Sequence, residues 1–183
     1  MDLSVLNSLP RGRLPIKTYA LENSFHDRIY RWILRLAAEG RQIYMVYPLI
    51  EEGEAPGIRS AADSYAELSR GVFRDIPCGL LHGKMTPAQK ESVMRSFREG
   101  AVKILFSTTV VEVGVDVPNA VLMVIENAER FGLAQLHQLR GRVGRGTHQS
   151  YCVLFSEKIT ERMKIMEEVS DGFTLSEKDL ELR

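Results

Sequence analysis

The stretch CGLLHGKMTPAQKESVMRSFREGAVKILFS, residues 78–107, decides the fold class. It begins and ends with short apolar runs of the kind that form buried strands. Thr86 followed by Pro87 marks the start of a helix between them, because threonine is a good N-cap and proline suits the first helical position. We therefore predict a strand, a helix over 87–98 and a second strand, which together form a βαβ unit with parallel strands.

The same alternation continues along the whole chain. Apolar and β-branched runs predict strands at 16–20, 42–47, 78–81, 102–106, 121–125 and 151–155. Apolar residues in helical phase predict helices at 25–38, 61–69, 87–98, 133–140 and 160–169. Several strands are continuously apolar, as strands covered by helices on both faces are. We expect an α/β fold with three layers, α/β/α, around a mainly parallel sheet.

Composition limits the kinds of partner. Lys+Arg and Asp+Glu balance at 24 each among 183 residues, so a contact with nucleic acid has to be local. No stretch approaches the roughly 18 apolar residues of a membrane span, and the start lacks the apolar core of a secretion signal, which favours a cytoplasmic protein. Cys78 and Cys152 lie in apolar runs without metal-ligand spacing. They are expected to be buried thiols, and no metal site is expected.

The segment QLHQLRGRVGRG, residues 135–146, suggests an anionic ligand. Arg142 and Arg145 are three positions apart, so on a helix or its last turn they point the same way. The glycines beside them let other backbone approach, and residues 131–156 contain no Asp or Glu to neutralise them. This pattern favours a clamp for a phosphate chain. The alternative is a solvated helix face whose arginines pair with carboxylates.

No complete phosphate-binding loop accompanies these arginines. GLLHGKM, residues 79–85, has one residue too few between its glycines for a P-loop, and Met85 stands where a Mg²⁺-ligating Ser or Thr is needed. The chain also has no Asp-Glu dipeptide to serve as a Walker B acid. The chain therefore has arginines that suit a phosphate but lacks the loop that would bind it. This combination indicates half of a phosphate site whose other half belongs to another domain.

A second polar run, ILFSTTVVEVGVDVPNA at 104–120, follows a buried strand. The hydroxyls of Thr108 and Thr109 are suited to bind a nucleic-acid phosphate, and Asp116 to accept a hydrogen bond from a ribose hydroxyl. The alternative is that these residues only cap turns, and that His82 is a packed core histidine. Because ligands bind at the carboxyl edge of open parallel sheets, we expect the chemistry at that edge.

The motifs HGKM, STTVVEVGVDVP and QLRGRVGRG, in this order, resemble the second RecA-like domain of superfamily 2 helicases. The resemblance is closer to the RecG branch-migration helicases. It extends to MVYPLIEE at 45–52, VIENAERFGLAQLHQLRGRVGRG at 124–146 and SDGFTLSEKDLELR at 170–183. The transcription-repair coupling translocases share part of the same sequence and remain an alternative. The resemblance implies a RecA-like fold.

It also implies roles for residues around the nucleotide. Arg142 and Arg145 would be arginine fingers on the γ-phosphate of ATP. Gly114 and Asp116 would face the nucleotide, with Asp116 toward the ribose. Gln138 would couple the nucleotide state to the grip on DNA. ATP and Mg²⁺ would be held mainly by a preceding RecA-like domain.

The remaining motif residues are implied to contact DNA. His82, Gly83, Thr108 and Thr109 would touch the DNA backbone, whereas the family pattern gives no role to Arg140. The implied partners are forks and branched DNA junctions, together with the preceding RecA-like domain and the wedge domain of the same polypeptide.

The resemblance divides the chain into three parts. Residues 1–15 would be an interdomain linker, 16–157 the C-terminal RecA-like domain, and 158–183 a helix and the start of the translocation element. Without Walker A and B segments, the isolated chain is expected to be inactive. Two alternatives remain open: a DNA-binding or interaction module that keeps a helicase fold without a motor, and a flavodoxin-like binder. The latter needs a phosphate loop after the first strand, which the sequence lacks.

Overall fold

The computed structural model describes residues 14–49, 58–108 and 116–169. These residues build a six-stranded sheet in the order β1-β6-β5-β2-β4-β3, and every ladder in it is parallel. The strands are β1 Lys17–Glu22, β2 Gln42–Tyr47, β3 Cys78–Leu81, β4 Ile104–Thr108, β5 Ala120–Ile125 and β6 Tyr151–Ser156. Each predicted strand is present, with ends shifted by at most a few residues.

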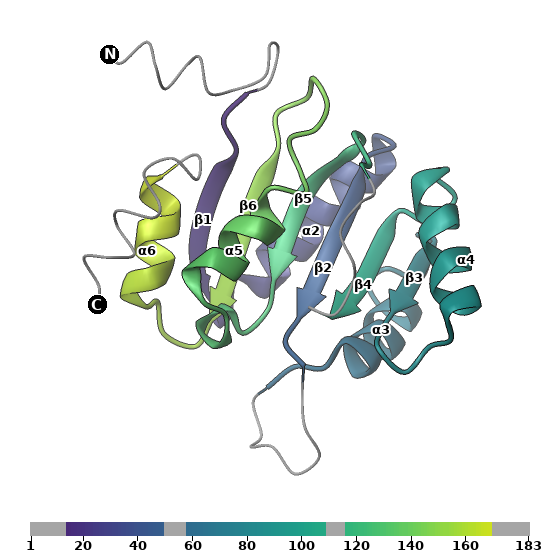
Figure 1. Cartoon of the computed structure of the whole chain (residues 1–183), viewed down its shortest axis with the longest axis horizontal. Helices are drawn as coiled ribbons and strands as arrows, with labels where there is room; N and C mark the ends of the chain where they lie inside the picture. The colour runs from purple at the N-terminus through teal and green to yellow at the C-terminus, as the bar shows by residue number, and fades with distance from the viewer. Residues whose placement is uncertain (1–13, 50–57, 109–115, 170–183) are drawn as a thin grey trace.

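Helices cover both faces of this sheet (Figure 1). They are η1 Asn23–Phe25, α2 His26–Ala38, α3 Ala61–Arg70, α4 Pro87–Arg98, η2 Ala128–Arg130, α5 Leu133–Arg140 and α6 Glu161–Glu168. α2 and α3 pack on one face, and α4, α5 and α6 on the other. The Thr86 side chain accepts from the Gln89 N–H, and the Gln89 side chain accepts from the Thr86 N–H, so α4 begins with a capping box where the sequence predicted. The predicted three-layer architecture is confirmed.

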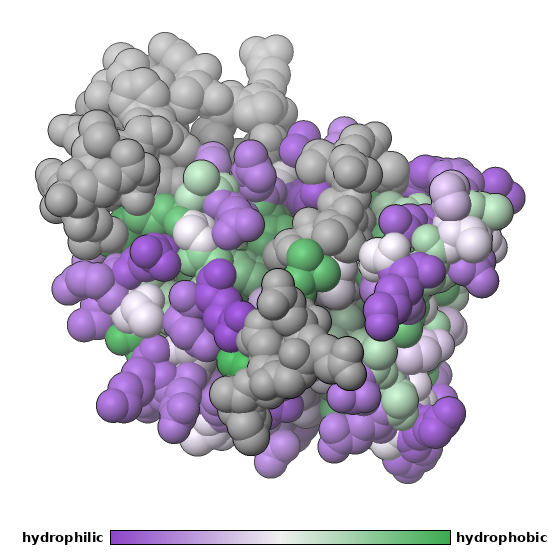
Figure 2. Space-filling model, turned by 60° about the horizontal axis from the view of Figure 1, so that its bottom comes forward, coloured by the Kyte–Doolittle hydropathy of each residue, from purple (hydrophilic) through white to green (hydrophobic). Residues whose placement is uncertain are grey.

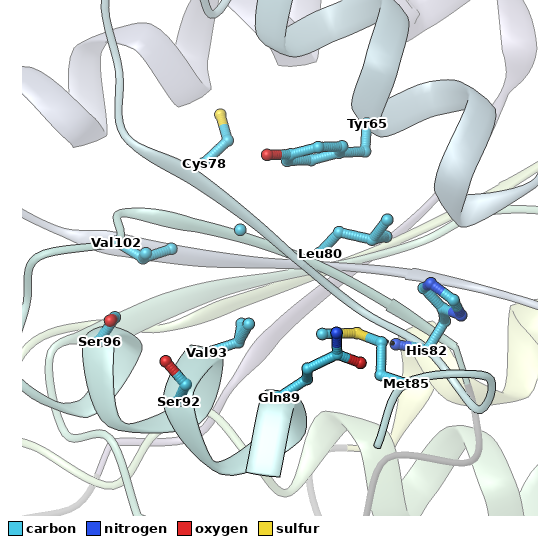
Figure 3. A pocket seen from close by; sticks show the side chains of 11 residues that line it. Tyr65, Cys78, Leu80, His82, Met85, Gln89, Ser92, Val93, Ser96 and Val102 are labelled. Atoms are coloured by element: carbon cyan, nitrogen blue, oxygen red, sulfur yellow. Dashed lines mark hydrogen bonds between the residues drawn. The ribbon is translucent and has the colours of Figure 1, made fainter. Parts of the chain in front are cut away.

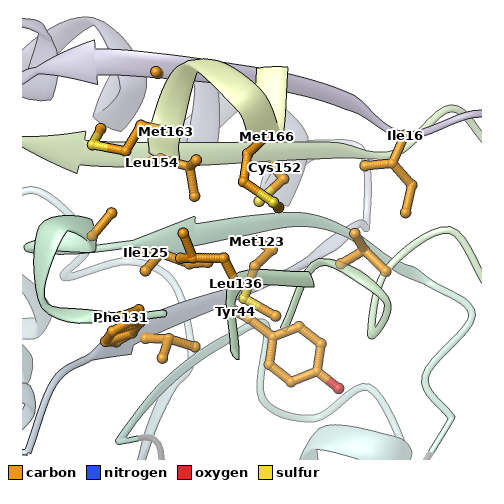
Figure 4. Close-up of a cluster of buried hydrophobic side chains, with 14 of the residues drawn as sticks. Ile16, Tyr44, Met123, Ile125, Phe131, Leu136, Cys152, Leu154, Met163 and Met166 are labelled. Atoms are coloured by element: carbon orange, nitrogen blue, oxygen red, sulfur yellow. The ribbon is translucent and has the colours of Figure 1, made fainter. Parts of the chain in front are cut away.

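The core has one apolar cluster on each side of the sheet. On the α4–α6 side, Leu136 and Met163 pack on β5 and β6 (Figure 4). Cys152 is fully buried in this cluster, and burial raises the pKa of its thiol to about 12. Cys78 is half-buried, with a thiol pKa raised by burial to about 11, so the prediction of a buried thiol holds fully for Cys152 alone. Among the described residues, no helix is long and apolar enough to cross a membrane.

A polar network fixes the amino edge of the sheet. The Gln42 side-chain amide donates to the carbonyl oxygens of Phe97 and Val102, at 2.5 and 2.9 Å. Asn119 donates in turn to the Gln42 side-chain oxygen at 3.1 Å and accepts from the Arg41 guanidinium at 2.8 Å. These bonds hold Asn119 in place just before β5. They also hold the short segment that leads to it from Asp116, the residue predicted to face the ribose.

Candidate functional site

The arginine motif straddles the end of α5. The helix ends at Arg140, so Arg142 and Arg145 lie in the turns that follow and not on the helix itself. Gly144 has φ +78°, a left-handed conformation that favours glycine, and its N–H donates to the Ser150 hydroxyl at 3.0 Å. The expected position on a helix or in its last turn is therefore not found for Arg145, which follows Gly144 beyond the end of α5.

Arg145 lies beside Asp116. One guanidinium nitrogen of Arg145 is 3.7 Å from an Asp116 carboxylate oxygen, and its Nε donates to the Gly141 carbonyl at 2.8 Å. The side chains are 39% and 69% exposed, and an ion pair this long and this solvated contributes little to stability. The absence of acids near Arg145 in the sequence was misleading, since a carboxylate distant in the chain reaches it. The contact nevertheless brings together two residues predicted for the nucleotide.

Tyr44 on β2 lies within electrostatic reach of the same residues. Its ring is 3% exposed and packs edge-on against Phe97. Burial raises the pKa of its phenol to about 12, Arg142 and Arg145 act to lower it, and Asp116 acts to raise it. The phenol is therefore within electrostatic reach of Asp116, Arg142 and Arg145. Gln138 is exposed on α5, one helical turn before Arg142.

These groups lie over the α4–α5 face of the sheet. A side chain at Gly146 would meet the Pro118 carbonyl oxygen at 2.7 Å, and Pro118 comes just before β5. Ser150, which holds the Gly144 loop, comes just before β6. Arg145 and Asp116 are thus near the amino ends of these strands, because a helix after a parallel strand returns the chain to the amino edge. Asp116 and Arg145 therefore do not lie at the carboxyl edge, where the sequence analysis expected the chemistry. We call Asp116, Gln138, Arg142 and Arg145 the nucleotide set.

The residues predicted to contact DNA do lie at the carboxyl edge. Leu81 pairs with Ser107, so His82 and Thr108 follow side by side at the ends of β3 and β4. His82 is half-buried in a turn and accepts from the Lys84 N–H at 3.2 Å through Nδ1, so it is not a core histidine. Gly83 is exposed. We call His82, Gly83 and Thr108 the DNA set; Gly114 and Thr109, which were also predicted, lie outside the described residues.

The surface around the carboxyl edge is mostly hydrophilic (Figure 2). Lys84, which the sequence analysis did not single out, is exposed there beside His82. Thr108 differs from its neighbours because its hydroxyl is buried and has no hydrogen-bond partner in the described residues. In this conformation it cannot reach a phosphate directly, so the predicted contact requires Thr108 or the residues that cover it to move.

A groove of about 460 Å³ runs along the free edge of β3, between α3 and α4 (Figure 3). Tyr65 lies on its α3 side, Ser92 and Ser96 on its α4 side, and His82 at one end. None of the residues that line it is a lysine or an arginine. The groove therefore does not suit phosphate, and the DNA set touches it only through His82.

A smaller cavity has walls from both sets. It measures about 10 Å³ and is lined by Tyr44, Val46, Met94, Ser107, Thr108, Leu139 and Arg142. Such a space holds about one water molecule. Arg142 of the nucleotide set and Thr108 of the DNA set therefore meet at the same small void.

Arg140, for which the sequence gave no role, is a structural residue. It is 1% exposed, and its guanidinium donates to the Thr18 hydroxyl at 3.2 Å and to the carbonyl oxygens of Met166 and Val169 at 2.9 and 2.6 Å. It ties α5 to β1 and to the end of α6. Its spacing from Leu133 and Leu136 places it on the buried stripe of α5, and this signal was available in the sequence.

Another polar cluster lies on the opposite side of the sheet. Glu126, fully buried after β5, accepts from the His26 ring at 2.8 and 2.9 Å and lies 3.5 Å from the Arg59 guanidinium. The His26 ring stacks on Phe155. This cluster fixes the start of α2 against the carboxyl end of β5. Glu126 directly follows an apolar strand, and the sequence analysis did not consider it as a buried charge.

Comparison with known proteins identifies the domain. A family model for the helicase conserved C-terminal domain matches residues 27–147, which include the described members of both sets. The chain belongs to the helicase conserved C-terminal domain family. Its predicted likeness to superfamily 2 helicases is therefore confirmed.

Relatives of this helicase domain match along its whole length. The ATP-dependent DNA helicase RecG of Bacillus subtilis is 53% identical over 188 residues, which cover 100% of this chain and 27% of the relative. RecG of Synechocystis sp. is 49% identical over 187 residues, covering 100% of this chain and 22% of the relative. A solved structure of RecG bound to a three-way DNA junction superposes with a TM-score of 0.79 and 43% identity, covering 96% of this chain and 23% of that one.

The resemblance of this helicase domain to RecG, and its RecA-like fold, are thus confirmed. The chain spans about a quarter of the length of these relatives. The roles of individual residues in either set stay predictions.

Proposed function

We propose that this chain is the C-terminal motor domain of an ATP-dependent double-stranded-DNA translocase of the RecG type. The whole protein would remodel replication forks and Holliday junctions in recombination and repair, in the cytoplasm. The observation that carries this proposal is the convergence of Asp116, Arg142 and Arg145 over the α4–α5 face. Its further support is the sequence identity with RecG helicases along the entire chain.

The nucleotide set fits one half of an ATP site. Two guanidiniums provide donors for phosphate oxygens, and the exposed Asp116 carboxylate provides an acceptor for a ribose hydroxyl. ATP and Mg²⁺ would be held mainly by a preceding RecA-like domain. Gly114, which lies outside the described residues, is also proposed to face the nucleotide. Arg142 and Arg145 would stabilise the charge that spreads over the transferred phosphoryl oxygens. Gln138 would transmit the nucleotide state to the DNA grip.

Before a nucleotide is shared, Arg145 and Asp116 face each other. When the preceding domain closes, this contact would break. Arg145 would then contact the phosphate of the nucleotide, and Asp116 would contact its ribose. The exchange costs little because the existing pair is long and solvated. The same geometry predicts that the isolated chain has no ATPase activity, since half of the site would belong to the preceding domain.

The DNA set fits contacts to the phosphate backbone. Thr108 ends β4, and His82 and Gly83 follow β3, at positions where backbone N–H groups and hydroxyls suit phosphate oxygens without reading sequence. Thr109, which lies outside the described residues, is proposed to act with them. Binding by the whole protein should therefore weaken steeply with salt and depend little on sequence. Its partners would be branched DNA and, within the same polypeptide, the preceding RecA-like and wedge domains.

The test is to replace each finger in the full-length protein. Arg142→Ala and Arg145→Ala should each lower DNA-stimulated ATP hydrolysis by about 10³- to 10⁵-fold, with ATP binding largely intact, because the lost interaction acts on the transition state. Arg95→Ala is the matched control, since Arg95 is an exposed arginine on α4 whose carboxylate contact is 3.8 Å long. Normal turnover in both finger variants would remove the assignment.

A further inference from the structure

The small cavity between α4 and α5 is the place where the two proposed sets approach each other. Thr108 ends β4 at the carboxyl edge, and Arg142 follows α5 on the face of the sheet, yet both line the same void of about 10 Å³. Tyr44 lines it as well. A feature that touches both sets is a candidate for the connection between DNA and nucleotide.

Tyr44 is held rigidly at this position. β2 is a central strand, where Tyr44 pairs in register with Leu105 of β4 and Met123 of β5. Its ring packs against Phe97 of α4 at a centroid distance of 5.0 Å. Figure 4 shows the ring at the margin of the apolar cluster, with the hydroxyl directed away from the other labelled side chains. The apolar part of the residue is thus anchored in the core, and its hydroxyl points out of the apolar cluster.

The chemistry of a phenol suits the neighbourhood of an arginine finger. The charges that act on this phenol come from Arg142, Asp116 and Arg145. Like any phenol with a pKa of 10 or above, it is neutral at physiological pH. A neutral oxygen orients a guanidinium by hydrogen bonding without cancelling its charge. A carboxylate at the same place would neutralise the charge that a finger has to present to phosphate.

The cavity gives this contact a mechanical consequence. The void is small enough to hold about one water molecule, so the side chains around it are closely packed, and close-packed side chains transmit small shifts to one another. The Thr108 hydroxyl is buried, so a DNA contact there has to move Thr108, at the end of β4, or the residues that cover it. That movement changes the wall shared with Arg142.

We propose that Tyr44 is a positioning residue for Arg142: its hydroxyl orients the guanidinium, and the cavity that both residues share with Thr108 passes the DNA-bound position of β4 to that finger. This inference rests on the proposed function, since it requires that Arg142 act on ATP. It extends that function to a residue outside the sequence motifs.

The test is Tyr44→Phe in the full-length protein, which removes one oxygen and keeps the ring. DNA-stimulated kcat should fall about tenfold with an unchanged KM for ATP, because a misdirected finger loses transition-state contact and not ground-state binding. The thermal unfolding midpoint, measured on the same preparation, should change by no more than a few degrees. Tyr65→Phe is the control, since Tyr65 also packs its ring in the fold, against Phe106 on the other side of the sheet, and it should leave kcat unchanged.

A double variant shows whether Tyr44 acts through Arg142. Arg142→Lys keeps the charge but loses the planar fork that a neighbouring oxygen can orient. Adding Tyr44→Phe to Arg142→Lys should therefore lower kcat by less than twofold further. A full tenfold further loss would overturn the inference, as would wild-type kcat in Tyr44→Phe. If Arg142→Ala itself keeps normal turnover, the proposed function fails; if it abolishes turnover while Tyr44→Phe is unaffected, this inference alone fails.

Discussion

The nucleotide set and the DNA set differ in the charges that they present. Over the α4–α5 face, Arg142, Arg145 and Asp116 bring ionised side chains close together, with Arg145 and Asp116 in a long, exposed pair. At the carboxyl edge, His82, Gly83 and Thr108 offer a turn, a glycine and a buried hydroxyl. Stabilising a transferred phosphoryl group needs fixed positive charge, whereas tracking along DNA needs contacts that form and break easily. On the proposed function, one fold would therefore serve two phosphate ligands by different means.

The first prediction, with the largest effect, separates the arginines by role. Arg140→Ala should lower the free energy of unfolding by about 3 kcal/mol, because it leaves two buried carbonyl oxygens and a hydroxyl without their donor and truncates a buried side chain. Arg145→Ala, at an exposed side chain, should change it by less than about 0.5 kcal/mol. Chemical denaturation of both variants measures this. Equal stabilities would contradict the assignment of Arg140 as structural and Arg145 as functional.

A second prediction concerns the phenol between the sets. Burial raises the pKa of Tyr44 from 10.0 to about 12, so it favours the neutral form in the folded state. The stabilisation of the folded state by this buried neutral phenol is fully present below pH 10 and is lost as the pH rises from 10 through 12. The two-unit shift corresponds to roughly 2 to 3 kcal/mol. Between pH 9 and 12, the free energy of unfolding of the wild type should therefore fall by about this amount more than that of Tyr44→Phe. Identical pH profiles would show that the phenol is solvated.

The third and smallest effect falls on the Arg145–Asp116 contact. Asp116→Asn should change the free energy of unfolding by less than about 0.5 kcal/mol, because the pair is long and exposed. In the full-length protein, KM for ATP should rise about fivefold, since a hydrogen bond to a ribose hydroxyl is weakened. Steady-state ATPase assays and thermal unfolding test this, with Asp63→Asn on α3 as a control. A stability loss without any effect on KM would make Asp116 a structural partner of Arg145.

Much of the fold could be predicted from the sequence because its signals are local. Apolar runs located every strand, and the Thr86–Pro87 pair located the start of α4. The order of the strands depends on contacts between distant segments, and no local pattern encodes it.

The site was harder to predict for the same reason. Asp116 meets Arg145 across the fold, and the arginine loop lies over the sheet because α5 runs back toward the amino edge. Tyr44 lies in an apolar strand, where no sequence pattern distinguishes it from its neighbours. The buried position of Arg140, in contrast, follows from its spacing on α5. Motif spacing therefore singled out the residues that are proposed to bind ligands, but not the residues that support them.

The most direct test of the central claim is a structure of the full-length protein bound to branched DNA and a non-hydrolysable ATP analogue. The quantity to measure is the distance from the Arg142 and Arg145 guanidiniums to the γ-phosphate oxygens. We predict hydrogen-bond distances of about 3 Å for both, with the Arg145–Asp116 contact broken. Guanidiniums that stay over the α4–α5 face, with Arg145 still paired to Asp116 while the nucleotide is bound elsewhere, would contradict the account.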